Sequence, residues 1–184
     1  MIRPLQGRDI WSVLRVEWLA FPDDPWTTTT MRGRLARMLA EHPRGAASAA
    51  RAVRLIRLTG AVSAGRLLCL VLFGRPRGLR CLVAEAGSAV AGYGCIKTTG
   101  PAGDIQSLAV RSERRQQGVG SALLHELVDT ARCRGCHHVT LYVRADNAGA
   151  RRLYEHRGFS QADLLPGYYR PSGTDAVVMR LDLV

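Results

Sequence analysis

The stretch RRQQGVGSALLHELV, residues 114–128, constrains the fold most strongly because it puts two glycines where a helix begins. A β-type pattern, DIQSLAVR (104–111), precedes it, and a helical pattern runs over 118–134. The first turn of a helix has unpaired N–H groups and the positive end of the dipole, and glycine lets an anion approach them. The stretch predicts a mixed α/β chain with either a phosphate-binding turn or a simple tight connection.

The remaining elements follow from hydrophobic periodicity. Residues 2–5 form an expected strand, and 7–21 an amphipathic helix with Asp9 as its cap. An expected hairpin, formed by strands at 80–87 and 89–98, precedes the glycine segment. After that segment we expect a strand at 137–145, a helix at 147–158 and two last strands at 159–163 and 175–184. Residues 43–79, rich in Ala, Arg and Leu, predict a helical insertion in a single domain over 1–184.

Charge and composition limit the partners and the compartment. The net charge is +11, and 25 of the 26 basic residues are Arg, which fits either a coding bias or an anionic partner. The start MIRPLQGRDI lacks a secretory pattern, and the longest apolar run, 67–74, is too short to cross a bilayer. We therefore expect a cytoplasmic protein with no membrane partner, whose five cysteines are reduced thiols.

The sequence CRGCHH (133–138) has the C-x-x-C-H spacing of covalent haem attachment. Such attachment normally belongs to exported proteins, and zinc would need a second ligand pair at suitable spacing, which the chain lacks. The stretch also lies where a helix is expected to end, which accounts for its glycine. We expect no metal.

Several ordered motifs resemble the GNAT superfamily of acyl-coenzyme A-dependent N-acyltransferases. R-x-x-G-x-G at 115–120 resembles its motif A, and LYVRADNAGARRLYEHRGF at 141–159 resembles its motif B. GYYRPSGTDAVVMRLDL (167–183) and AFPDDPW (20–26) are similar to the tail and substrate loop of RimI-type and eukaryotic N-terminal acetyltransferases. The resemblance covers 80–184 and, more loosely, 1–42, and it implies a mixed, mostly antiparallel central sheet flanked by helices.

The resemblance implies acetyl-coenzyme A as co-substrate. By the motif match, backbone groups of Leu108 and Val110 hold the pantetheine arm on a strand that splays from its neighbour, and one N–H there polarises the thioester carbonyl. Asn147 matches an asparagine that hydrogen-bonds the same arm. The pyrophosphate is expected at the glycine segment, beside Arg115 and on the backbone N–H groups of Gln116, Gly118, Val119, Gly120 and Ser121.

The resemblance places Tyr154 at the position of the general acid that protonates the departing sulfur. The general base stays open. Tyr142 stands where RimI-type enzymes carry a glutamate, and tyrosine is a poor base at neutral pH although it could order a water. Asp104, acting through water, and then Asp23 match carboxylates used elsewhere in the superfamily. An α-amino group, partly neutral already, could also react without a dedicated base.

Tyr168 and Tyr169 match an aromatic pair that walls the peptide entrance of N-terminal acetyltransferases, with Phe21 and Pro22 opposite. They favour a protein or peptide α-amine as acceptor. Lysine, a peptide metabolite or another small amine, and a non-catalytic coenzyme A-binding module are alternatives. A nucleic-acid adaptor is disfavoured because the chain has no clustered stacking aromatics. The insertion could serve as a lid, a carrier-docking site, a seat for a longer acyl chain, a homodimer surface or a structural elaboration.

Overall fold

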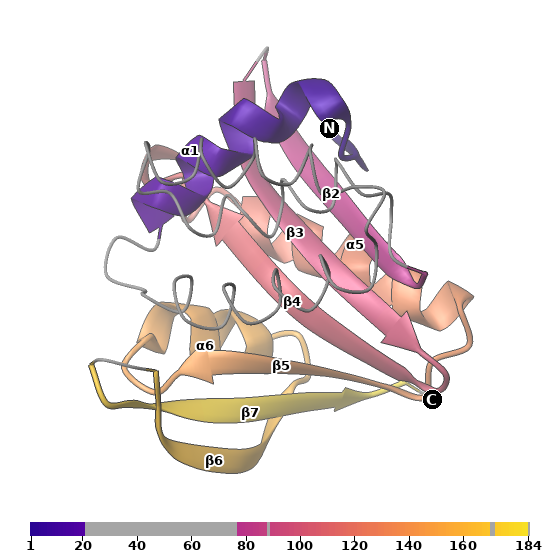
Figure 1. Cartoon of the computed structure of the whole chain (residues 1–184), viewed down its shortest axis with the longest axis vertical. Coiled ribbons are helices and arrows are strands. Elements are labelled where there is room, and N and C mark those ends of the chain that lie inside the picture. The colour runs from indigo at the N-terminus through magenta and orange to yellow at the C-terminus, as the bar shows by residue number, and fades with distance from the viewer. Residues whose placement is uncertain (21–76, 88, 170–171, 184) are drawn as a thin grey trace, which may run out of the picture.

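The computed structural model describes residues 1–20, 77–87, 89–169 and 172–183. Within them, one sheet has the strand order β1-β2-β3-β4-β5-β7-β6 (Figure 1). Neighbouring strands are antiparallel except β4 and β5, so the expected mixed, mostly antiparallel sheet is confirmed. The strands are β1 (Ile2–Pro4), β2 (Leu79–Ala86), β3 (Ala89–Thr99), β4 (Ala102–Val110), β5 (His138–Arg144), β6 (Ser160–Tyr169) and β7 (Thr174–Asp182).

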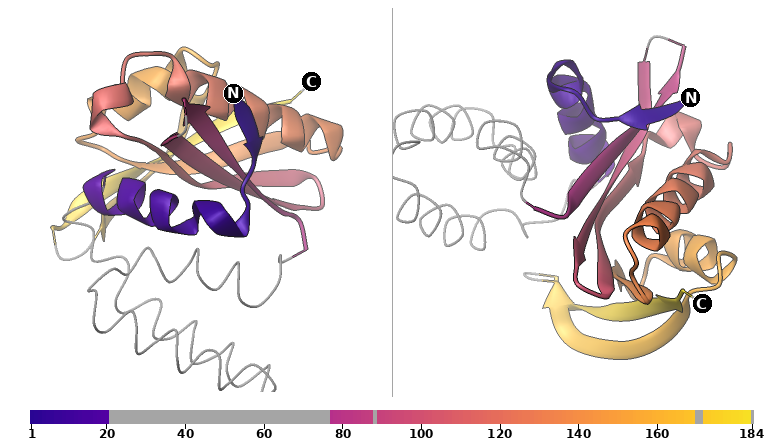
Figure 2. Two further views of the ribbon diagram at one scale, coloured as in Figure 1. Left: turned by 90° about the horizontal axis from the view of Figure 1, so that it is seen from above. Right: turned by 90° about the vertical axis from the view of Figure 1, so that its right-hand side faces the viewer.

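Helices cover both faces of this sheet. The short η1 (Gly7–Asp9) leads into α1 (Ile10–Ala20) on one face, while α5 (Val119–Cys133) and α6 (Ala148–Glu155) lie on the other (Figure 2). The core is divided accordingly. Val13 and Val16 of α1 pack with Tyr93 in one cluster, and the buried leucines of α5 belong to a second cluster that includes Tyr154. The result is a three-layer α/β/α arrangement.

The central strand β3 carries a glycine where α5 crosses it. A Cβ at Gly94 would lie 2.8 Å from Leu127 Cδ1 and 3.2 Å from Leu108 Cδ1, closer than packed carbon atoms allow. A side chain at this position would therefore require the Leu127 and Leu108 side chains to shift. The glycine thus lets α5 pack closely against β3.

A β-bulge interrupts β4 at Gln106. Ser107 pairs with Cys95, and Ile105 pairs with the next residue, Ile96, which leaves Gln106 as the extra residue on β4. The effect is visible in the core: Ile105 packs on the α5 face and Ala109 on the α1 face, although residues four apart share a face in a regular strand. The bulge turns the second half of β4 relative to the first half.

The two parallel strands separate after this point. Pairing between β4 and β5 runs only from Ala102 with His138 to Ile105 with Leu141. Figure 1 shows the strands close together near the start of each arrow and diverging toward the arrowheads. The last five residues of β4 therefore face a gap on the β5 side, as the resemblance implied.

The N-terminus is fastened to β2 by a charged network. The Arg3 guanidinium donates to both carboxylate oxygens of Asp9, at 2.6 and 2.7 Å, and its Nε donates to Glu85 at 2.9 Å. Asp9, only 4% exposed, also accepts the backbone N–H of Gln6. The sequence had suggested Asp9 as a helix cap, and the structure shows it as the centre of this network.

The expectation that all the cysteines are reduced is wrong for one pair. Cys81 of β2 and Cys95 of β3 form a disulfide, with Cα atoms 4.2 Å apart. They lie directly opposite each other in the antiparallel register, where cross-strand Cβ atoms come within bonding reach. Cys133 and Cys136 are free.

Other expectations are adjusted or lie outside the described residues. Leu79, which the sequence placed in the insertion, begins β2, and the other residues of that insertion up to 76 are not described. Phe21, Pro22 and Asp23 also lie outside the described residues. The expected strand 159–163 is longer and reaches Tyr169. Among the helices that the structure describes, none has the length and apolar character to span a bilayer.

Candidate active site

Alternate backbone groups at the end of β4 point away from β3, toward the side on which β5 has separated. Arg111 N–H donates to the Ala91 carbonyl at 2.9 Å, so hydrogen-bonded pairs with β3 occur at alternate residues back along β4. Leu108 and Val110 fall between these pairs, and their backbone groups point away from β3 toward the β5 side. The Val110 carbonyl is in fact reached from outside the sheet, by Arg115 Nε at 3.4 Å.

The turn after β4 leads these groups into the N-terminus of α5. A short helical turn, η4 (Ser112–Arg114), is followed by Gln116 and Gly118 with positive φ angles of 60° and 78°. Gly118 is the N-cap and makes no side-chain cap, and the Ala122 N–H donates to the Gly118 carbonyl at 2.9 Å. Glycine suits the left-handed conformation at this N-cap. The N–H groups of the first turn are left for an anion or solvent.

Helix α6 lies against this N-terminus. A Cβ on Gly120 would lie 3.3 Å from Leu153 Cδ2 and 3.6 Å from Val110 Cγ2, so the glycine lets α6 and β4 approach closely. Asn147 caps α6, with its Oδ1 accepting the Ala150 N–H at 3.1 Å. The two N–H donors of the Asn147 amide are not used by this cap.

Tyr154 lies on α6 and is 7% exposed. Its ring packs against Phe159, with centroids 5.9 Å apart in a tilted arrangement. Burial disfavours the phenolate and raises the pKa of Tyr154 to about 12. The phenol therefore carries its proton throughout the neutral and mildly alkaline range, as a proton donor must.

Asp104 lies on the opposite face of the sheet from Tyr154. It precedes Ile105, which faces α5, and is in register with Thr140 of β5. The Gln106 side chain donates to its carboxylate at 3.2 Å. Asp104 is half-buried, and the bulge residue thus orients the carboxylate beside the point where the strands part.

Three tyrosines meet on the Asp104 face. Tyr142 of β5 is 46% exposed and stacks on Tyr168, with centroids 5.6 Å apart and an interplanar angle of 16°. Tyr168 meets Tyr169 edge-to-face at 5.3 Å, and the Arg144 guanidinium carbon lies 5.5 Å from the Tyr169 centroid. Sequence reasoning expected Tyr168 and Tyr169 in a substrate wall, and the structure adds Tyr142 and Arg144 to the same surface.

One cation near α5 was missed by sequence reasoning. Arg157, just beyond α6, donates from Nε to the Ser121 hydroxyl at 2.8 Å, and its Nη2 donates to the same oxygen. The sequence signal was a basic residue before Gly158, close to the end of the motif B match. Its proximity to Ser121 depends on the packing of two helices.

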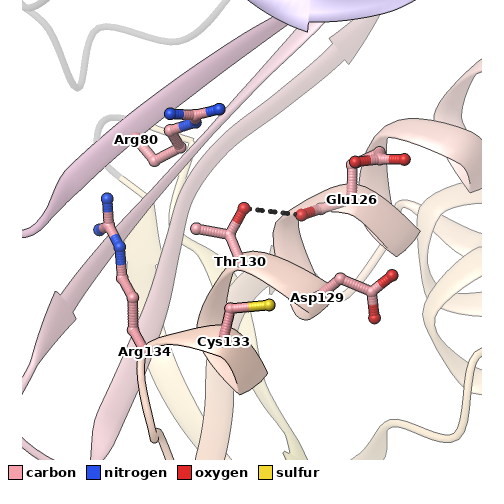
Figure 3. Close-up of a pocket in the computed structure, with 6 residues that line it drawn as sticks. All are labelled: Arg80, Glu126, Asp129, Thr130, Cys133 and Arg134. Atoms are coloured by element: carbon pink, nitrogen blue, oxygen red, sulfur yellow. Dashed lines mark hydrogen bonds between the residues drawn. The ribbon is translucent and has the colours of Figure 1, made fainter.

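A separate pocket lies at the other end of α5. It is lined by residues of α5, the residue that follows the helix and β2, namely Glu126, Asp129, Thr130, Cys133, Arg134 and Arg80 (Figure 3). The Thr130 hydroxyl donates to the Glu126 carbonyl at 2.8 Å, a bond within the helix. No residue predicted for the site lines this pocket, and it is remote from the α5 N-terminus.

The C-x-x-C-H stretch is divided between surface and core. Cys133 is exposed, whereas Cys136 is buried and its thiol lies 3.9 Å from the Gly100 carbonyl. In the part of the chain that the structure describes, no three His, Cys, Asp or Glu side chains come together as a metal site.

Comparison with known proteins agrees with this geometry. The model of the Acetyltransferase (GNAT) family matches residues 61–159. An uncharacterized N-acetyltransferase of Methanocaldococcus jannaschii is 40% identical over 98 residues, which are 53% of this chain and 62% of that protein. The ribosomal protein bS18-alanine N-acetyltransferase of Escherichia coli is 39% identical over 79 residues, 42% of this chain and 53% of that protein.

The fold is shared as well. The crystal structure of the ribosomal-protein-S18-alanine N-acetyltransferase from Escherichia coli superposes with a TM-score of 0.68 at 22% identity, over 99% of this chain and 92% of that chain. The sequence matches span about half to three-fifths of the length of the two curated relatives. Because the family model covers more than half of the sequence and includes both the glycine turn and motif B, this chain belongs to the GNAT acetyltransferase family.

Proposed function

We propose that this chain transfers an acetyl group from acetyl-coenzyme A to the α-amino group of a protein or peptide, within a ternary complex. The observation that carries the proposal is the separation of β4 from β5 after Ile105 and Leu141, where backbone groups of β4 that do not pair with β3 precede the N-terminus of α5. An extended amide-bearing arm fits such a strand edge, and a pyrophosphate fits such a helix end. Acetyl-coenzyme A carries both.

The two substrates approach the separation between β4 and β5 from opposite faces of the sheet. The donor lies on the α5 and α6 side, with its pantetheine arm on Leu108, Val110 and Asn147 and its pyrophosphate on the first turn of α5. The acceptor enters from the α1 side, where Asp104 and the tyrosine cluster lie. The amine and the thioester therefore meet at the level of the sheet.

In the reaction, the neutral amine nitrogen attacks the thioester carbonyl carbon. The C–N bond forms and the C–S bond breaks, and the backbone N–H of β4 stabilises the negative oxygen. Asp104 accepts the amine proton through a water. Tyr154 assists the leaving sulfur; because its pKa is about 12, above that of an ordinary thiol, its help is chiefly a hydrogen bond to the forming thiolate.

The α-amino acceptor is supported by two features. The relative from Escherichia coli is named as a ribosomal protein bS18-alanine N-acetyltransferase. In this chain the Tyr168 and Tyr169 pair lies at the same side of the gap as Asp104, as a wall for an extended peptide. An α-amine has a pKa near 8, so it needs less help in losing its proton than lysine does.

Acetyl transfer followed by mass spectrometry onto two peptides tests the proposal. One peptide has a free N-terminus and no lysine, and the other has a blocked N-terminus and one lysine. We expect label on the first peptide only, with turnover about a hundredfold lower for Tyr154→Phe and unchanged donor binding. Label on the lysine peptide alone would reject the α-amino assignment, and unchanged turnover in Tyr154→Phe would remove Tyr154 from the reaction.

A further inference from the structure

We propose that Arg157 is a ligand of the donor pyrophosphate, acting together with the Ser121 hydroxyl; this rests on the proposed function. The inference starts from the position of the guanidinium. Two of its nitrogens donate to the Ser121 Oγ, and Ser121 lies in the first turn of α5. The cation is thus held at the helix end where the positive dipole and the unpaired N–H groups also converge.

The packing of α6 on α5 accounts for this position. Gly120, the residue before Ser121, leaves room for Leu153 of α6 at 3.3 Å from where a Cβ would be. Helix α6 ends two residues after Leu153, at Glu155, and the Arg157 N–H donates to the Tyr154 carbonyl at 2.9 Å. The same helix contact that seats Tyr154 therefore brings Arg157 across to Ser121.

The hydrogen bonds leave capacity for an anion. The Ser121 oxygen accepts from Arg157, so its own O–H is free to donate. A guanidinium has five N–H donors, of which these contacts use two, and the planar group suits a phosphate. Both partners can point their remaining hydrogens at one phosphate.

The charge balance favours an anionic ligand over a purely structural role. Among the described residues, no carboxylate forms an ion pair with Arg157, although its helix neighbour Arg151 is 3.9 Å from Glu155. Arg114 and Arg115 lie in the turn that leads into α5 and add charge of the same sign.

Titration calorimetry with coenzyme A and with dephospho-coenzyme A, which retains the pyrophosphate but lacks the 3′-phosphate, tests the assignment. We expect Arg157→Gln to weaken both ligands by about tenfold or more and to reduce the salt dependence of binding. Arg132→Gln, at the opposite end of α5 about 16 Å away, is the matched control and should bind as the wild type does. Thermal unfolding of each variant reports on the fold.

Ser121→Ala supplies a second measure. If Arg157 and Ser121 act on one phosphate, the two substitutions should be non-additive, with the double variant little weaker than Arg157→Gln alone. Additive losses of affinity would overturn the shared role of the two residues. Losses of thermal stability with unchanged affinity would also overturn it, and would mean that the Arg157–Ser121 contact only holds the end of α6 against α5.

Each remaining outcome is decisive. Weakened binding of coenzyme A with unchanged dephospho-coenzyme A binding would place Arg157 at the 3′-phosphate and overturn the pyrophosphate assignment. Unchanged affinity for both ligands in Arg157→Gln would overturn any role in donor binding while leaving the proposed function intact. Failure of the wild-type protein to bind either ligand would overturn the proposed function and this inference together.

Discussion

Tyr142 stacks on Tyr168 nearly face to face, with ring centroids 5.6 Å apart and an interplanar angle of 16°. Tyr142 occupies the strand position at which RimI-type enzymes carry a glutamate, and here it contributes an aromatic surface. The stack joins β5 to β6 on the face where Asp104 lies. We therefore predict that this position contributes to the wall for the acceptor and that Asp104 takes the amine proton in the proposed reaction.

This arrangement predicts that the ring of Tyr142, and not its hydroxyl, affects acceptor binding. Tyr142→Phe keeps the stacked ring, so we expect acceptor KM and kcat within about twofold of the wild type. Tyr142→Ala removes the stack, worth about 1 kcal/mol, and should raise acceptor KM about fivefold with donor KM unchanged. Steady-state kinetics with both substrates varied check this. A large loss of kcat in Tyr142→Phe would instead restore a role for its hydroxyl.

The raised pKa of Tyr154 predicts a broad alkaline plateau. With an α-amine peptide, kcat/KM should rise up to about pH 8 as the amine loses its proton, and then stay level to about pH 10. It stays level because a phenol with a pKa of about 12 is still protonated there. The pH profiles of the wild type and of Tyr154→Phe make the comparison. A fall near pH 10 that only the wild type shows would mean that Tyr154 titrates at its ordinary value.

A charge placed in the first turn of α5 should block the donor. Gly120→Asp puts a carboxylate where the pyrophosphate is proposed, and like-charge repulsion should lower coenzyme A affinity by about a hundredfold or more. An acidic residue suits a helix N-terminus, so loss of the helix is not the cause. Gly120→Ala, whose Cβ must displace Leu153 Cδ2 by a few tenths of an ångström, is the matched steric control. Equal losses in both variants would point to sterics alone.

The N-terminal network predicts an acid-dependent contribution to stability. Hydrogen bonds from the Arg3 guanidinium hold the pKa of Asp9 below its usual value, so the folded state favours the carboxylate. This stabilisation is complete above the unfolded pKa of about 3.9 and is lost as the pH falls below it. Asp9→Asn should lower the free energy of unfolding by about 2 kcal/mol at pH 7, because it removes the charge-assisted hydrogen bonds between Arg3 and Asp9 and leaves Arg3 with Glu85 as its carboxylate partner. Urea unfolding from pH 7 to pH 3 should show the difference between wild type and variant shrinking below pH 4; a constant difference contradicts the linkage.

The Cys81–Cys95 disulfide predicts a stability that depends on reductant. It closes a sequence separation of 14 residues, for which loop entropy gives about 3 kcal/mol. A reducing thiol should therefore lower Tm, while the Cys81→Ser, Cys95→Ser double variant should melt at one temperature in both conditions. Cys133→Ser, which removes an exposed free thiol, is the control and should respond as the wild type does. Identical melting of the wild type with and without reductant would argue against the bond.

The register of one hairpin was readable in part from the sequence. The strands at 80–87 and 89–98 predicted an antiparallel pair with a turn between them. Counting outward from the Ala86–Ala89 pair would place Cys81 opposite Gly94, and the irregularity between Ala84 and Glu85 shifts the register by one residue, so that Cys81 lies opposite Cys95. The expectation that all five cysteines are reduced rested on their odd number and on the absence of a secretory pattern, and it was wrong for this pair.

The sequence by itself determined the elements and the chemistry of the central turn. Periodicity located β4, α5, β5 and α6, and the glycines marked the helix end, because backbone conformation and side-chain pattern are local properties. What only the tertiary structure decided were contacts between distant residues. Arg157 reaches Ser121 across 36 residues, and Tyr142 meets Tyr168 between two strands that are not neighbours in the sheet. Such contacts depend on how helices pack and where a bulge turns a strand, and one residue's displacement in register exchanges the two faces of a sheet.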